Sequence, residues 1–103
     1  MKETVAERKL LYSLKNEKEQ HEFIIYLGSP YFVTEGTVNF SVGSEGCWGC
    51  AINVSGLNED YSEKIYGADS LQTIELAVKA IEFIIKRIGK KYDIFYLSSE
   101  PYL

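Results

Sequence analysis

The most regular part of the sequence, and the part that decides the fold, runs from Asp69 to Gly89 and reads DSLQTIELAVKAIEFIIKRIG. Its apolar residues recur at steps of three and four positions, which is the spacing of one face of an α-helix. The stripe consists of Leu71, Ile74, Val78, Ile81, Ile85 and Ile88, and Ala77 and Ile84 widen it. The pattern predicts one long amphipathic helix over residues 70–88.

Both ends of this segment carry helix signals. Asp69 is followed three positions later by Gln72, a capping box in which each side chain can bond a free backbone N–H of the first turn. Gly89 follows the stripe, and the basic residues around it suit the negative end of the helix dipole. Because one face is strongly apolar, the helix must pack on another element of the fold.

Alternation of apolar and polar residues on both sides of the helix predicts β-strands. The segments are 7–14, 21–27, 37–42, 47–55 and 63–66 before the helix and 93–97 after it. Polar residues 15–20 predict the turn of a hairpin. The segment 21–27 has apolar residues on both of its faces, which suggests that both faces are covered. Glycines recur in residues 31–46, so a long ordered loop is the alternative to the strand at 37–42.

A run of strands followed by one helix and a last strand is typical of an α+β domain. We expect an antiparallel sheet of about five or six strands that packs one face on the long helix. The chain has 103 residues, which is a common size for one domain, so residues 1–103 are expected to form a single domain.

The composition argues against several classes of function. The chain has 11 Lys and Arg residues against 15 Asp and Glu and a formal charge of -4, which argues against a nucleic-acid partner. A single histidine, His21, excludes sites that need two or more imidazoles. The glycines are dispersed and match neither a phosphate-binding loop nor a dinucleotide fingerprint. We therefore expect no cofactor and no enzymatic activity.

The sequence also predicts a cytoplasmic protein. No apolar run approaches the roughly 20 residues that cross a bilayer, so no membrane partner is expected. Charged residues fill Met1–Lys9, where a secretion signal needs an apolar core. Two cysteines close together do not make a disulfide framework, which fits a reducing compartment.

The two cysteines, Cys47 and Cys50, form a C-x-x-C motif, which occurs in dithiol redox centres and in zinc sites. A redox motif needs a helix after its first cysteine, whereas strand alternation continues here to residue 55. On a strand the two side chains point to opposite faces, and no second C-x-x-C completes a zinc site. We interpret Cys50 and Trp48 as core residues and Cys47 as a loop or edge thiol, with redox or metal binding as the alternative.

Aromatic residues are abundant, with 8 Tyr, 5 Phe and 1 Trp, more than one helix can cover. Tyrosine is enriched in protein interfaces because it combines a large rigid ring with a polar tip. The candidate interface residues are Tyr26, Tyr31, Phe32, Tyr61 and Tyr66. The alternative is that these rings cover the edges of the core.

The segments W-G-C-A-I-N-V-S-G and K-I-Y-G-A-D-S-L-Q-T-I-E-L-A resemble a family of small uncharacterised bacterial proteins, which has a W-x-C strand, a Y-G-x-D-S-x-Q helix entry and a short C-terminal strand. The matching residues are Glu7, Arg8, Leu10, Trp48, Cys50, Gly56, Tyr66, Gly67, Asp69, Ser70, Leu71 and Gln72. The resemblance implies a fold and a bacterial origin but no activity. Cys47 and residues 31–46 depart from the pattern, which makes Cys47 a poor candidate for a shared catalytic role.

These features favour a non-enzymatic protein-binding module, for example an immunity or antitoxin-type protein that neutralises a toxin. An acidic chain would suit a basic partner such as a nuclease through electrostatic steering. The alternatives are a thiol-redox or metal-binding protein and a structural homodimer that buries an exposed sheet edge or a tyrosine patch.

Overall fold

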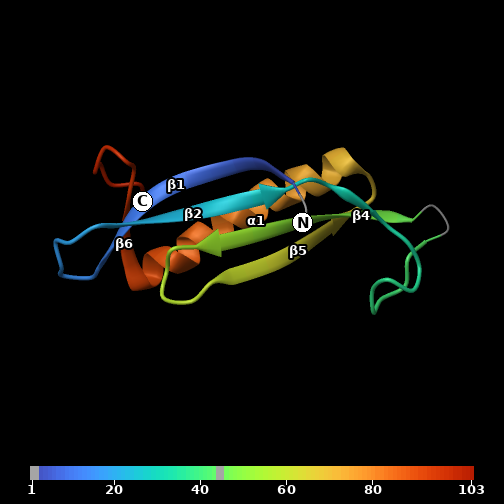
Figure 1. Cartoon of the computed structure of the whole chain (residues 1–103), viewed down its shortest axis with the longest axis horizontal. Coiled ribbons are helices and arrows are strands. Elements are labelled where there is room, and N and C mark those ends of the chain that lie inside the picture. The colour runs from blue at the N-terminus through green and yellow to red at the C-terminus, as the bar shows by residue number, and fades with distance from the viewer. Residues whose placement is uncertain (1–2, 44–45) are drawn as a thin grey trace.

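The computed structural model describes residues 3–43 and 46–103, and this part of the chain forms six strands and one helix (Figure 1). In chain order they are β1 (Thr4–Leu14), β2 (His21–Gly28), β3 (Tyr31–Val33), β4 (Cys47–Ser55), β5 (Tyr61–Gly67), α1 (Ser70–Lys91) and β6 (Tyr92–Phe95). The strand pairs are antiparallel. The expected α+β class, with one strand after the helix, is confirmed.

Strand β4 organises the sheet because it pairs with three others. Along one side it pairs first with β3 and then with β2, and along the other side with β5. Strands β2 and β3 thus form one line that is interrupted at Ser29 and Pro30, where proline lacks the N–H that a ladder needs. Strand β1 follows on the far side of β2, and β6 pairs with only the last part of β1, Leu11–Leu14.

Helix α1 lies along one face of the sheet (Figure 1). Every second residue of the central strands points at the helix, and these side chains form the core. Fully burying an aliphatic or aromatic side chain stabilises a fold by about 1.5 to 3 kcal/mol. The core cluster therefore fixes the helix on the sheet; it consists of Leu10, Tyr12, Phe23, Ile25, Leu27, Cys50, Ile52, Val54, Ala77, Ile84, Ile85, Tyr92 and Ile94.

The helix packs largely through the expected stripe, since Ala77, Ile84 and Ile85 are buried and Ile74, Ile81 and Ile88 pack against them, but its first half is rotated toward Thr73. Thr73 and Ala77 are fully buried, whereas Leu71 and Val78 are 67% and 48% exposed. The cause lies at Gly67, where an added Cβ would stand 2.7 Å from Thr73 Oγ1 and 2.9 Å from its backbone nitrogen. Backbone and helix approach so closely there that small side chains turn inward and the larger ones turn out.

The two ends of α1 differ in how well the sequence predicted them. At the start, the Asp69 carboxylate accepts a hydrogen bond from the Gln72 backbone N–H at 2.7 Å, as expected. The Gln72 side chain accepts from the backbone N–H of Ala68 instead of that of Asp69. At the other end the helix continues through Gly89 to Lys91, because the chain passes directly into β6. No helix within residues 3–43 and 46–103 is long and apolar enough to span a membrane.

The predicted strand at 37–42 is wrong, because these residues form bends and irregular backbone. The strand of this region is β3, which continues the line of β2 and finds a partner at Cys47–Gly49 of β4. The Glu35 carboxylate accepts a hydrogen bond from the backbone N–H of Val42 at 2.8 Å, which closes the segment into an ordered loop. Residues 44–45 belong to the segment 31–46, for which the sequence left a strand and a loop as alternatives, and they lie outside the described residues.

The last strand also differs from its prediction, spanning Tyr92–Phe95 in place of 93–97. The chain turns after it, with the Ser99 backbone N–H bonded to the Tyr96 carbonyl oxygen at 2.8 Å. Pro101 then pairs back onto Phe95, so the C-terminal residues run beside β6.

Candidate binding surface

The sheet has a second face, which points away from α1. The core residues of each strand alternate with side chains on this opposite face, which we call the open face. Val33 on this face is buried. The other apolar residues of the face include a half-buried group: Leu11, Ile24, Tyr26, Tyr31, Ala51, Tyr66 and Phe95. Charged side chains, among them Glu7, Lys9, Glu22 and Lys64, are exposed around them. The open face thus has an aromatic and aliphatic centre and a charged rim.

Two tyrosines form a rigid pair at one end of the open face. Tyr31 and Tyr66 lie on either side of Gly49, in one row across β3, β4 and β5. The Tyr31 ring covers the glycine, since an added Cβ there would stand 2.6 Å from the ring atom Cζ. Burial, followed by a side-chain hydrogen bond with Tyr66, raises the pKa of Tyr31 to about 12. Only glycine at position 49 leaves room for this arrangement.

The loop that replaces the predicted strand also reaches this pair. The Phe40 ring packs edge-on against Tyr66, with centroids 5.0 Å apart. Phe40 itself remains 41% exposed. The loop therefore shields one side of the tyrosine pair and extends the aromatic surface.

Tyr26 marks a second position on the open face, nearer its middle. It lies opposite Glu7 of β1 on one side and Asn53 of β4 on the other. A shallow hollow beside it is bordered by Asn53, Ser55, Asp60 and Ser62. Tyr26 thus combines an apolar ring with polar neighbours, which is the composition of a typical interface anchor.

The five aromatic residues that the sequence singled out do not form one patch. Tyr26, Tyr31 and Tyr66 share the open face, while Phe32 and Tyr61 belong to the helix side. Phe32 packs edge-on against Trp48 at 5.6 Å. The Tyr61 hydroxyl donates to Glu63 at 2.8 Å and accepts from Arg87 at 3.0 Å, so it joins β5 to the helix. Successive residues of a strand point to opposite faces of the sheet, so the position of each aromatic residue along its strand decides which face it joins.

The cysteines are separated by the same alternation. Cys50 is completely buried in the core, and its thiol donates to the Gly28 carbonyl oxygen at 3.0 Å. Cys47 is half-buried at the start of β4, opposite Val33. Neither cysteine forms a disulfide, and the described residues contain no group of three or more His, Cys, Asp or Glu side chains placed to hold a metal ion.

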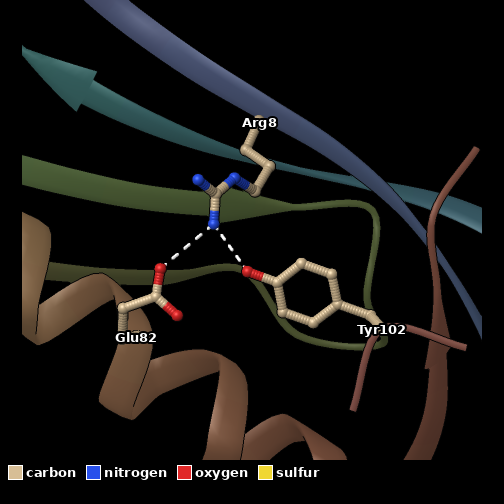
Figure 2. A network of polar contacts seen from close by, with 3 residues as sticks. All are labelled: Arg8, Glu82 and Tyr102. Atoms are coloured by element: carbon tan, nitrogen blue, oxygen red, sulfur yellow. Dashed lines mark hydrogen bonds and ion pairs between the residues drawn. The ribbon is translucent and has the colours of Figure 1, made fainter.

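A polar cluster that the sequence did not reveal joins β1, α1 and the C-terminus (Figure 2). Arg8 Nη1 donates to Glu82 Oε1 at 3.1 Å and to the Tyr102 hydroxyl at 2.6 Å. Burial raises the pKa of Tyr102, and the neighbouring Arg8 opposes that shift. The cluster spans 94 positions of sequence, so local patterns carry no signal for it.

Sequence reasoning also missed the aliphatic part of the open face. Ile24 lies two residues from Tyr26 on β2, Leu11 lies on the neighbouring strand β1, and Phe95 lies opposite Leu11 on β6. The one available signal was the apolar content on both faces of residues 21–27. That signal suggested a covered face, whereas the described part of the chain supplies a helix on the other face alone.

The architecture is that of a small α+β protein with one antiparallel sheet, one covering helix and an aromatic open face. Within this class the chain belongs to a family defined by a domain of unknown function, DUF6968, whose model matches residues 6–93. The expected kinship to an uncharacterised family is thus confirmed. No curated protein and no solved structure matches the chain.

Proposed function

We propose that this protein is a non-enzymatic protein-binding module and that a partner protein docks on the open face. The observation that carries the proposal is the half-exposed aromatic and aliphatic centre of that face, formed by Tyr26, Tyr31, Tyr66, Ile24 and Leu11. An antiparallel sheet with one solvated face normally turns polar side chains outward. Apolar side chains at these positions are therefore better explained by a partner than by the fold.

The arrangement has the properties of a binding surface. Tyrosine, tryptophan and arginine dominate the energetics of protein interfaces, with polar side chains at the rim that exclude water. Tyr31 and Tyr66 are already held in place by their mutual hydrogen bond above Gly49. Rings that are fixed before binding lose little conformational entropy when a partner docks.

We propose more specifically that the partner is a toxin and that the protein is of the immunity or antitoxin type, from a bacterial cytoplasm. The formal charge of -4 supports a basic partner, such as a nuclease. Opposite net charges accelerate encounter and suppress wrong partners. Covering the active surface of a toxin requires a broad binding face but no catalytic group of its own.

The test is protection of cells against a toxin encoded beside this gene, combined with site-specific crosslinking. A photoreactive residue at Tyr26 should crosslink the toxin, and the same residue at Phe83 on the exposed side of α1 should not. Phe83 is a matched control because it is an aromatic residue that is 68% exposed. Absence of protection together with absence of a crosslink at Tyr26 would overturn the proposal.

A further inference from the structure

Part of strand β1 has an unpaired edge. On one side β1 pairs with β2 along most of its length, with an irregularity between Thr4 and Ala6. On the other side β6 pairs with β1 only from Leu11 onward. Between these two limits, the residues from Ala6 to Leu10 have a regular backbone whose outer edge pairs with no described strand. Such an edge presents free N–H and C=O groups to another strand.

The geometry of a two-fold axis restricts how two copies can pair through this edge. An axis perpendicular to the sheet keeps each side chain on its own face of the combined sheet. Directly opposed residues of an antiparallel pair also share a face, so their residue numbers must add up to an even number. An axis through Arg8 satisfies this rule and lies at the middle of Ala6–Leu10.

The charges favour this register over its neighbours. With the axis at Arg8, Glu7 lies opposite Lys9 of the partner subunit, and Lys9 lies opposite the partner's Glu7. Both side chains are accessible, at 44% and 48% exposure. Moving the axis to Glu7 would oppose two carboxylates, and moving it to Lys9 would oppose two ammonium groups. Opposite charges across a strand pair stabilise it, and like charges destabilise it.

The cluster of Arg8, Glu82 and Tyr102 reduces the repulsion between the two Arg8 side chains that meet at the axis. Arg8 points to the helix side of the sheet, where it would face its own copy across the axis. Each guanidinium is already paired with Glu82 at 3.1 Å (Figure 2). The repulsion between the two arginines is therefore offset by the carboxylates that accompany them.

Apolar surface next to the free edge would also gain from a second strand. A hollow between the sheet and α1 opens there, bordered by Ala6, Ile25, Leu27, Val78 and Ile81. Val78 at its margin is 48% exposed. An added strand would remove part of this surface from water, which favours association.

We infer that the protein forms a two-fold homodimer in which Ala6–Leu10 pairs with the same stretch of a second copy. The two sheets then join into one continuous sheet. The inference goes beyond the proposed function and does not depend on it, because this edge pairing leaves the open face accessible.

The inference is tested by sedimentation at loading concentrations from roughly 1 μM to 1 mM, a range that spans weak association. The wild-type chain should show a reversible monomer–dimer equilibrium. Lys9→Glu places carboxylates opposite each other in two positions and should weaken the dimer about tenfold. Glu7→Lys places ammonium groups opposite each other in the same two positions and should weaken the dimer to a similar extent. Lys64→Glu makes the same charge change on β5, away from the Ala6–Leu10 edge of β1, and should leave association unchanged.

Rescue distinguishes this register from any other contact. The double variant Glu7→Lys/Lys9→Glu exchanges the two charges and should dimerise as the wild type does. An equimolar mixture of the two single variants should form heterodimers more strongly than either variant associates alone. A monomer at every concentration, or a dimer that ignores both single substitutions, would overturn the inference. Thermal unfolding by circular dichroism confirms that each variant is folded.

Discussion

Gly49→Ala is the substitution that tests the tyrosine pair of the open face most sharply. The new Cβ would stand 2.6, 2.7 and 2.9 Å from the atoms Cζ, Oη and Cε2 of Tyr31. Carbon atoms in good contact are about 3.5 to 4.0 Å apart, so the ring must move by about 1 Å. The obstacle is the far end of a flexible side chain, and we expect the Tyr31 ring to swing outward while β4 keeps its place.

The magnitude follows from two opposing contributions. Overpacking costs about 1 to 3 kcal/mol, a range that includes the displaced ring and its hydrogen bond. Replacing glycine in a strand recovers about 0.4 to 1 kcal/mol through the unfolded state. The net loss in free energy of unfolding should be about 1 to 2 kcal/mol. The pKa of Tyr31, now about 12, should fall toward the ordinary value of 10.0 as the ring becomes solvated.

The sign of the pH dependence is set by the raised pKa. The folded protein favours the neutral phenol, so Tyr31 contributes stability that is fully present below pH 10 and lost as the pH rises toward 12. Phenolate absorbance followed from pH 9 to 13 measures the titration, and Tyr31→Phe identifies which signal belongs to this residue. Urea unfolding measures the stability.

Gly43→Ala is the matched control, because a Cβ there meets nothing within 4 Å. It should leave the titration unchanged and raise the free energy of unfolding by about 0.4 to 1 kcal/mol, through the unfolded state alone. If Gly49→Ala keeps a tyrosine that titrates near pH 12 and also keeps the wild-type stability, the described packing of Tyr31 over Gly49 is wrong.

Three other predictions concern the helix cap, the thiols and the Arg8 cluster. Asp69→Ala should lower the free energy of unfolding by about 1 kcal/mol in urea unfolding, because the Gln72 backbone N–H loses its partner; no loss would mean that the cap is not formed. Cys47 should react with a thiol reagent in the folded protein while Cys50, which is completely buried, reacts only on unfolding; equal rapid reaction would revive the redox hypothesis. Glu82→Gln should change stability by less than about 1 kcal/mol, because the ion pair with Arg8 is half exposed; a larger loss would mean that the cluster is essential to the fold.

The helix and most strands could be predicted because their signals are local. Periodicity and the cap at Asp69 located α1, and alternation located β4, because each pattern reports one face turned to a core. The rotation of the helix could not be predicted, since it depends on the close approach of Thr73 to Gly67 across two elements. Hydrophobicity ranks Thr73 as polar and so does not predict that it faces the sheet in place of Leu71 and Val78.

The missed strand and the divided aromatic group have a common cause. Residues 37–42 alternate as a strand should, but β3 lies in line with β2 and so obtains β4 as a partner. Likewise, Tyr61 and Tyr66 both lie on β5, and pairing places only Tyr66 in the row with Tyr31. Alternation shows which residues share a face, whereas the position of the helix decides which face is buried.

The measurement that tests the central claim most directly is the affinity of the purified protein for the toxin encoded beside its gene. Calorimetry compares this affinity between the wild type and two variants. Tyr26→Ser removes an aromatic ring from the open face, and Phe83→Ser removes one from the exposed side of α1. Both should fold as the wild type does. We predict that Tyr26→Ser weakens binding about tenfold or more, as expected for an interface anchor, and that Phe83→Ser leaves it unchanged. Wild-type affinity for Tyr26→Ser, or a loss confined to Phe83→Ser, would contradict the assignment of the open face as the binding surface.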